Sequence, residues 1–255
     1  MVSASDAFSR SSDTFPLVSP AATVQPRVEE VETLIFSDVH LGSDLSRPEA
    51  LLATLKKYAF QRLILLGDVL DDLNFGRLPA SHWNLLAYLR TLCEPGQNVE
   101  VIWVEGNHDR LLSKVTRNFL GLTVRKRYQW TSGGKTFLAM HGHQFDTFVA
   151  RHPFITEAAC RLYVTLQRLD SNHHRLSRFL KRTSKAWLRM SDLVAEGAVG
   201  YAARRGVDGI FCGHTHRPLS RIFGKITYYN TGCWTEKPAS FITLTDCKTE
   251  LHECP

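Results

Sequence analysis

The sequence predicts an α/β fold, and three observations support that class. In the first half of the chain, short apolar runs alternate with stretches of helical character. Several of these runs end in Asp, Asn or His, as strands of α/β proteins do where functional loops leave the sheet. At 255 residues and 44% apolar content, the chain is long enough to bury a full core as one large domain or two small ones.

The first half yields a tail followed by alternating strands and helices. Residues 1–29 are rich in Ser, Ala, Thr and Pro and lack apolar periodicity, so a disordered tail is expected there and a folded domain over 30–255. Prolines at positions 48 and 79 suit first helical turns. The expected elements are a strand ending at Asp38, a helix from about Pro48 to Phe60, a strand ending at Asp68, a helix from about Pro79 to Leu92, and a strand from Val99 to Val104.

The second half has a different pattern. Residues 127–140, with Ser132-Gly133-Gly134-Lys135 at their centre, predict a β-hairpin, and residues 209–255 predict strands and turns. Between them, at about 148–205, apolar residues fall on one helical face. We therefore expect a helical insertion that interrupts the strands.

The insertion carries the positive charge of the chain. Residues 168–189 contain seven basic residues and one acidic residue, a surplus of six that equals the formal net charge of the whole chain. Aromatic and Leu residues are interleaved, which predicts a basic amphipathic helix. Either it packs its apolar stripe on the domain and leaves the charges in solvent, or it binds a phospholipid headgroup layer, another anionic amphiphile or nucleic acid.

The six cysteines show no C-x-x-C pairing, and the first residues lack the basic-then-apolar layout of a signal peptide. No apolar run approaches the roughly 18 residues that span a bilayer. We expect reduced thiols in a cytoplasmic protein, with peripheral contact to the inner face of the membrane if the insertion binds lipid.

Five apolar runs end in potential metal ligands. One Asp-x-His is a weak signal, but five such ends could meet at one edge of a sheet. Imidazole, carboxylate and one amide oxygen suit borderline ions, so two divalent cations are expected, Mn first with Fe or Zn as alternatives. The motifs are Asp38-x-His40, Gly67-Asp68-x-x-Asp71, Gly106-Asn107-His108-Asp109, His141-Gly142-His143 and Gly213-His214-Thr215-His216.

Such a site would act on phosphate esters. Two cations about 4 Å apart repel each other unless an anionic oxygen lies between them, and Asp68 is the natural bridging carboxylate. The site keeps a net positive charge and should attract phosphate. The expected chemistry is attack on phosphorus by a water molecule that the cations activate.

In order and spacing, these motifs resemble the signature of calcineurin-like metallophosphoesterases from about Thr33 to Trp234. The resemblance implies a four-layer fold, two mixed sheets flanked by helices, with a dinuclear metal centre at the strand ends. It implies that His108 contacts the substrate phosphate and assists the leaving group, with Asp109 orienting His108. The implied ligands are Asp38, His40, Asp68 and His216 for one ion and Asp68, Asn107, His141 and His214 for the other.

Neighbouring polar residues have alternative interpretations. Asp71 either orients a ligand, which we favour, or belongs with Asp72 to an ordinary acidic turn. His143 and Asp146 either support the ligands from behind or begin the insertion, and we favour the supporting role for His143.

Within the family, residues 141–146, 213–218 and 229–234 and the helical insertion resemble the UDP-2,3-diacylglucosamine hydrolases, although His108 stands where those enzymes carry Arg. The resemblance implies hydrolysis of the pyrophosphate of a nucleotide-sugar lipid, with the insertion as a lid over the acyl chains. Alternatives are a nucleotide or nucleic-acid phosphodiesterase and a binding module that has lost catalysis. The oligomeric state stays open. Expected substrate contacts are Arg178, Lys181, Arg182 and Arg217.

Overall fold

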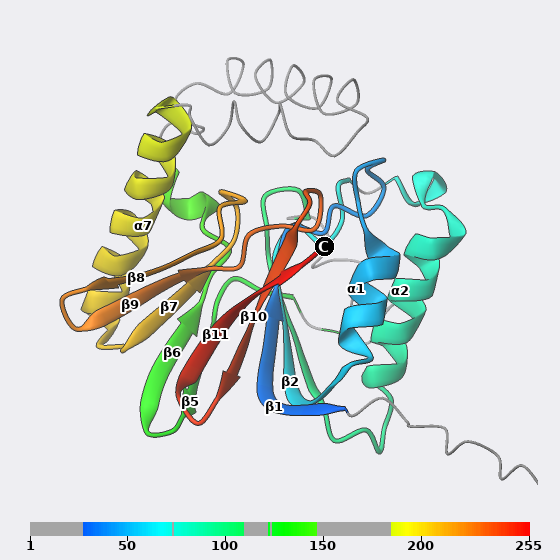
Figure 1. Ribbon diagram of the computed structural model, residues 1–255, viewed down its shortest axis with the longest axis horizontal. Coiled ribbons are helices and arrows are strands. Elements are labelled where there is room, and N and C mark those ends of the chain that lie inside the picture. The colour runs from blue at the N-terminus through cyan, green and yellow to red at the C-terminus, as the bar shows by residue number, and fades with distance from the viewer. Residues whose placement is uncertain (1–27, 73, 110–121, 123, 147–184) are drawn as a thin grey trace, which may run out of the picture.

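The computed structural model describes residues 28–72, 74–109, 122, 124–146 and 185–255, and these build two β-sheets with helices on their outer faces (Figure 1). The first sheet has the order β11-β10-β1-β2-β3-β4 and the second the order β5-β6-β7-β9-β8. The strands of the first sheet are β1 (Glu29–Phe36), β2 (Tyr58–Leu66), β3 (Glu100–Val104), β4 (Val124–Arg125), β10 (Ala239–Thr245) and β11 (Lys248–Cys254). Those of the second are β5 (Tyr128–Ser132), β6 (Lys135–Ala139), β7 (Gly209–Cys212), β8 (Leu219–Phe223) and β9 (Ile226–Asn230).

Alternating side chains on the central strands separate the interior into three apolar cores. On β2, Leu65 faces the core shared with α1 (Pro48–Leu55) and α2 (Ala80–Leu92), whereas Ile64 faces the core between the two sheets. On β7, Phe211 joins the core between the sheets and Ile210 packs toward α7 (Lys185–Arg205). Strands buried on both faces read as continuous apolar runs. The predicted four-layer α/β/β/α sandwich is therefore confirmed.

Strand direction brings the ends of the motif-bearing strands together. In the first sheet, β1, β2 and β3 run parallel, and in the second β6, β7 and β9 run parallel. Parallel strands place their carboxyl ends at one edge of a sheet, where loops can supply a site. The residues that follow β1, β2, β3, β6 and β7 are those that the sequence singles out.

Most predicted elements are confirmed, and one boundary is wrong. β5 and β6 form the antiparallel hairpin around the glycine pair at 133–134, and α2 ends at Leu92 as expected. The helix expected to continue to Phe60 instead ends at Leu55, and β2 begins at Tyr58. Tyr58 and Phe60 pair with Glu29 and Val31 of β1, so parallel strand pairing prevails over helical periodicity there.

The insertion and the tail lie mostly outside the described residues. Only α7 of the insertion is described; it covers the second sheet with a row of small residues, Ala195, Ala198 and Ala202. The basic residues Arg178, Lys181 and Arg182 lie outside the described part. Among the described residues, no helix has both the length and the apolar character needed to cross a membrane. Glu29, the last residue of the expected tail, already belongs to β1.

Candidate metal centre

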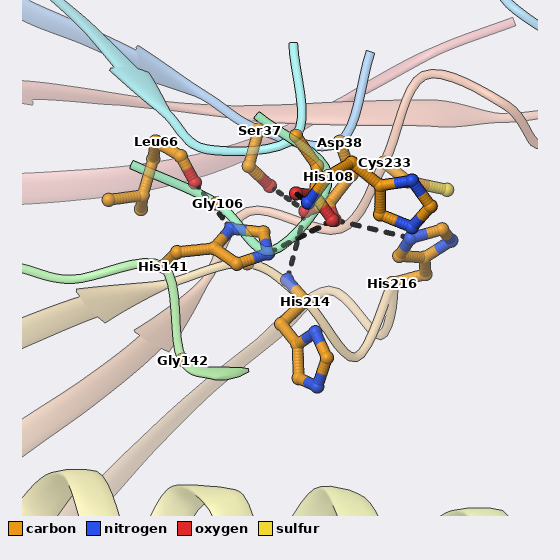
Figure 2. Close-up of polar contacts among 12 residues, drawn as sticks. Ser37, Asp38, Leu66, Gly106, His108, His141, Gly142, His214, His216 and Cys233 are labelled. Atoms are coloured by element: carbon orange, nitrogen blue, oxygen red, sulfur yellow. Dashed lines mark hydrogen bonds and ion pairs between the residues drawn. The ribbon is translucent and has the colours of Figure 1, made fainter. Parts of the chain in front are cut away.

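Loops at the carboxyl ends of strands from both sheets bring six of the predicted ligands together. Figure 2 shows four of them, Asp38, His141, His214 and His216. Backbone hydrogen bonds tie the loops after β1 and β2 to each other: the Asp38 amide donates to the Gly67 carbonyl, and the His40 amide donates to the Asp68 carbonyl, each at 3.0 Å. The six residues are Asp38 and His40 after β1, Asp68 after β2, His141 after β6, and His214 and His216 after β7.

Five of these six residues have left-handed backbone conformations, with φ between 50° and 64°. Residues with a Cβ rarely adopt positive φ, and such conformations persist only where the surrounding structure imposes them. These conformations occur in the loops that directly follow β1, β2 and β7, where the candidate ligands meet. The five are Asp38, His40, Asp68, His214 and His216.

Glycines in two motifs allow the loops to approach one another. A Cβ on Gly106 would overlap the Asp68 carboxylate and backbone nitrogen, and a Cβ on Gly213 would overlap Ser37 Oγ and Asp38 Oδ2. Only a residue without a side chain fits at either position. The glycine before Asn107 and the glycine before His214 are therefore required by the close packing of the site.

The first group of ligand atoms belongs to Asp38, His40 and His216. Asp38 Oδ1 lies 3.2 Å from His216 Nε2 and 3.9 Å from His40 Nε2, and the two imidazole nitrogens are 3.4 Å apart. All three atoms therefore face one small volume. Asp38 itself is fully buried, and its Oδ2 accepts hydrogen bonds from the Ser37 hydroxyl and the His214 amide.

The second group consists of Asp68, His141 and His214. His141 Nε2 lies 3.2 Å from Asp68 Oδ2 and 4.0 Å from Asp38 Oδ1, so it also borders the first group. Asp68 belongs to a further group with His40 and His108. The carboxylate of Asp68 thus stands between the two groups, the position expected of a bridging ligand.

Hydrogen bonds behind the ligands fix the orientation of three imidazole rings. His141 Nδ1 lies 2.8 Å from the Leu66 carbonyl, which can only accept, so Nδ1 carries the proton and Nε2 faces the centre. His214 Nε2 lies 3.0 Å from Asp146 Oδ2, and His40 Nδ1 lies 3.3 Å from Asp71 Oδ1. Carboxylate or carbonyl partners of this kind are typical of imidazoles that bind metals.

Two buried atoms of the centre test whether a cation fits. Asp38 Oδ1 and His141 Nε2 are buried and make no hydrogen bond of good geometry among the described residues, although Asp38 Oδ1 lies 3.2 Å from His216 Nε2 and His141 Nε2 lies 3.2 Å from Asp68 Oδ2. A buried carboxylate oxygen without a well-formed hydrogen bond is costly, and a divalent cation would satisfy both atoms at once. The donor set of carboxylate oxygens and imidazole nitrogens matches borderline divalent ions. The residues therefore fit a divalent metal.

The charges within the centre stabilise one another. Although burial opposes ionisation, His216 and His141 hold the pKa of Asp38 at about 2, and His141 holds that of Asp68 well below its usual value. Burial likewise opposes protonation of His141, but Asp68 and Asp38 raise its pKa to about 10. Without metal, the buried carboxylates of the centre are therefore balanced by a protonated His141, whose proton divalent cations would replace.

The motif after β3 differs from expectation at one residue. Asn107 is exposed on this loop, between Gly106 and His108, and its role as a ligand stays a prediction. Asp109, expected to orient His108, is fully buried and instead accepts hydrogen bonds from the amides of Val69 and Gly106 and from the Trp103 indole. Burial, with the nearby Asp68, raises the Asp109 pKa to about 6.

His108 takes its orientation from a different group. Its Nδ1 lies 2.7 Å from the Asp71 carbonyl, its amide donates to Asp68 Oδ1, and its ring meets the His40 ring edge-on at 4.9 Å. The ring is exposed at the rim of the centre, so Nε2 can face a substrate.

The remaining predicted residues lie around the centre. The His143 ring is 5.4 Å from that of His141, and Arg217, which follows His216, lies 3.7 Å from Asp192 of α7. Of the two polar residues that follow His141 in the sequence, His143 and Asp146, Asp146 is the one that contacts His214. Ser37, whose hydroxyl donates to Asp38 Oδ2, was not among the predicted site residues, and only its position directly before Asp38 could have pointed to it.

Comparisons with known proteins give a family and similar folds. The calcineurin-like phosphoesterase superfamily domain matches residues 31–249. No curated protein matches the chain. Similar solved structures include Yfce, a phosphoesterase from E. coli (19% identity, TM-score 0.47, 83% of this chain and 87% of that one). Another is vacuolar protein sorting 29 from Cryptosporidium parvum (14% identity, TM-score 0.47, 87% of this chain and 95% of that one).

The region that matches the family contains every candidate ligand. It begins within β1, before Asp38, and ends within β11, after His216. Both sheets, apart from the start of β1 and most of β11, and the whole edge that carries the candidate ligands fall within the match, and the chain belongs to the calcineurin-like phosphoesterase superfamily.

Proposed function

We propose that the chain is a metal-dependent phosphoester hydrolase with two divalent cations, Mn first among them. The observation that carries the proposal is the convergence of the two ligand groups around Asp68, with Asp38 Oδ1 and His141 Nε2 buried and without well-formed hydrogen bonds. Cations held there would lower the pKa of an attacking water and offset negative charge on the phosphoryl oxygens. A binding module without catalysis would not need to keep such strained ligand positions.

The protein's own residues hold the substrate and move the leaving-group proton. His108 donates its Nδ1 proton to the Asp71 carbonyl, so only the protonated ring can also donate from Nε2. In that form His108 binds a phosphoryl oxygen or protonates the departing oxygen. Asp71 contacts His108 through its backbone carbonyl and His40 through its carboxylate. It therefore fixes the orientation of the two rings relative to each other.

For the substrate, we propose the pyrophosphate of a nucleotide-sugar lipid such as UDP-2,3-diacylglucosamine. The resemblance of residues 141–146, 213–218 and 229–234 to hydrolases of that lipid supports it. The local surplus of basic and apolar residues at 168–189 also suits a ligand with an anionic head and acyl chains. Arg178, Lys181, Arg182 and Arg217 would contact the anionic head.

A panel of substrates tests this proposal. The manganese-loaded protein is assayed on a UDP-sugar lipid, a cyclic nucleotide, single-stranded nucleic acid and a bis-aryl phosphate ester. Joint replacement of Arg178, Lys181 and Arg182 by Ser should raise KM for the lipid and leave the aryl ester unchanged. Replacing three exposed lysines elsewhere, Lys56, Lys57 and Lys225, provides the control of equal charge.

The other outcomes separate the alternatives. If the triple replacement raises KM equally for the lipid and for the aryl ester, the basic segment does not contact the lipid. Cleavage of nucleic acid whose KM rises steeply with salt would indicate a phosphodiesterase that uses the basic segment on a polyanion. No turnover of any substrate by protein with two bound cations would contradict the hydrolase proposal itself.

A further inference from the structure

A second set of metal-binding side chains lies beside the centre. One ligand atom each from His216, Cys233 and Glu236 lies within 4.8 Å of the others. Cys233 is buried, and His216 and Glu236 are partly buried. Figure 2 shows Cys233 next to the His216 ring, on the side away from Asp38. The proposed hydrolysis gives no role to Cys233 or Glu236.

The loop that carries Cys233 and Glu236 is fixed to the centre. It connects β9 to β10, and the Trp234 amide donates to the Asp38 carbonyl at 3.0 Å. The Ser240 amide donates to the Cys233 carbonyl at 3.3 Å, and the Arg47 guanidinium lies 3.5 Å from the Glu236 carbonyl. These contacts set the positions of Cys233 and Glu236 relative to His216.

The chemistry of the three donors differs from that of the main centre. Sulfur, imidazole nitrogen and carboxylate oxygen are the donors of zinc sites, whereas carboxylate, carbonyl and water oxygens suit manganese and magnesium. The Thr235 hydroxyl donates to Cys233 Sγ at 3.5 Å, so the sulfur already acts as an acceptor. A thiolate and a carboxylate together neutralise a divalent charge.

The distances require only a small adjustment of the side chains. Bonds of about 2.0–2.3 Å in a tetrahedral zinc site place ligand atoms roughly 3.5 Å apart. The three atoms lie within 4.8 Å of one another, so rotation about the side-chain bonds of Cys233 and Glu236 can close the site. The fixed loop backbone need not move.

We propose that His216, Cys233 and Glu236 form a separate site for zinc or another thiophilic divalent cation, which shares His216 with the main centre. Nε2 of His216 faces Asp38 Oδ1 at 3.2 Å, so a cation that engages the ring from the side of Cys233 competes with the cation held by Asp38. Zinc in excess thus inhibits the manganese-loaded protein. The inhibition rests on the proposed hydrolase function, whereas the site itself does not.

Cobalt provides a spectroscopic probe whose thiolate band is specific to this site. None of the candidate ligands of the main centre is a thiol, so a thiolate-to-cobalt charge-transfer band in the near ultraviolet reports cobalt on a cysteine. Titration of the metal-free protein with cobalt should produce this band. Cys233→Ser should abolish it and Glu236→Gln should weaken cobalt binding. Cys247→Ser, which alters a partly buried thiol elsewhere in the fold, should leave it unchanged.

Zinc inhibition supplies the second measurement. Excess zinc should reduce manganese-dependent turnover of the wild-type protein at least tenfold more than that of Cys233→Ser. Equal inhibition of both proteins would overturn competition for His216. Absence of the band, or its persistence in folded Cys233→Ser, would overturn the site. A Cys233-dependent band in a protein without hydrolase activity would support the site and count only against the proposed function.

Discussion

At the scale of single residues, the sequence predicts where His141 lies but not how its ring is oriented. The residue directly follows the Met140 that ends an apolar run, so its place at the sheet edge could be predicted. Which nitrogen faces the centre could not, because the Leu66 carbonyl that orients the ring lies 75 residues earlier in the chain. The contacts of Asp109 were unpredictable for the same reason. Its partner Trp103 is near in sequence, but Val69 lies 40 residues earlier and is brought to it by the pairing of β2 with β3.

His108→Ala should leave the cations bound and slow turnover. General acid catalysis contributes about 10²- to 10⁴-fold, so kcat should fall by that order for esters with poor leaving groups and much less for good ones. The measurement is kcat for a series of aryl esters whose leaving groups differ in pKa, together with elemental analysis. His252→Ala, on the distant β11, is the control. An unchanged dependence on the leaving group would remove His108 from the mechanism.

Cation uptake should release protons, because His141 is charged in the metal-free centre and neutral as a ligand. Asp68 and Asp38 raise its pKa to about 10 against the opposing effect of burial, so the ring is protonated at pH 7. Cation affinity should therefore rise with pH up to about 10. Calorimetric titrations with manganese in buffers of different ionisation enthalpy measure the proton count.

The same pKa shift predicts how the metal-free protein responds to pH. Since the folded-state pKa of His141 exceeds the unfolded value of about 6.5, its contribution to stability is complete below that value. The contribution is lost as pH rises through about 10. Proton uptake instead of release on binding manganese would contradict this protonation state.

At the scale of elements, each apolar strand that ends in a motif could be predicted, and so could the hairpin of β5 and β6. The start of β2 could not, because Tyr58 and Phe60 become strand only through pairing with β1. The motif glycines could be identified in the sequence, but the structural reason for a glycine at each position could not. Gly106 lies against Asp68, a residue of another strand end, so its packing follows from the parallel arrangement of β2 and β3.

Gly106→Ala should therefore damage the centre and the fold together. The added Cβ overlaps the Asp68 carboxylate and backbone nitrogen, and overpacking of this kind costs about 1–3 kcal/mol. Urea unfolding and elemental analysis should show lower stability and loss of bound cations. Gly200→Ala in α7, where a Cβ meets nothing closer than 3.7 Å, should instead stabilise by about 0.5–1 kcal/mol. Full cation content in Gly106→Ala would show that Asp68 tolerates displacement.

At the scale of the whole molecule, the centre joins the two sheets. Asp38, His40 and Asp68 come from the first sheet, and His141, His214 and His216 come from the second. Between the sheets lies an apolar core that includes Ile64 and Phe211. Because each ligand group draws on both sheets, a cation binds only when the sheets are packed in their native relation. Cation binding and folding of the sandwich are therefore linked.

Manganese should accordingly stabilise the entire domain. A ligand at 100 times its Kd that binds only the folded state adds about 2.7 kcal/mol, which corresponds to a Tm increase of roughly 5–10 °C for a chain of this size. Calorimetric unfolding with manganese and with a chelator measures the shift. Asp68→Ala should lose it, because without the bridging carboxylate the two cations repel each other, whereas Asp72→Ala, an exposed neighbour, should keep it. A Tm shift retained in Asp68→Ala would contradict the bridging role. Two separate unfolding transitions, with manganese stabilising only one of them, would contradict a centre held by both sheets.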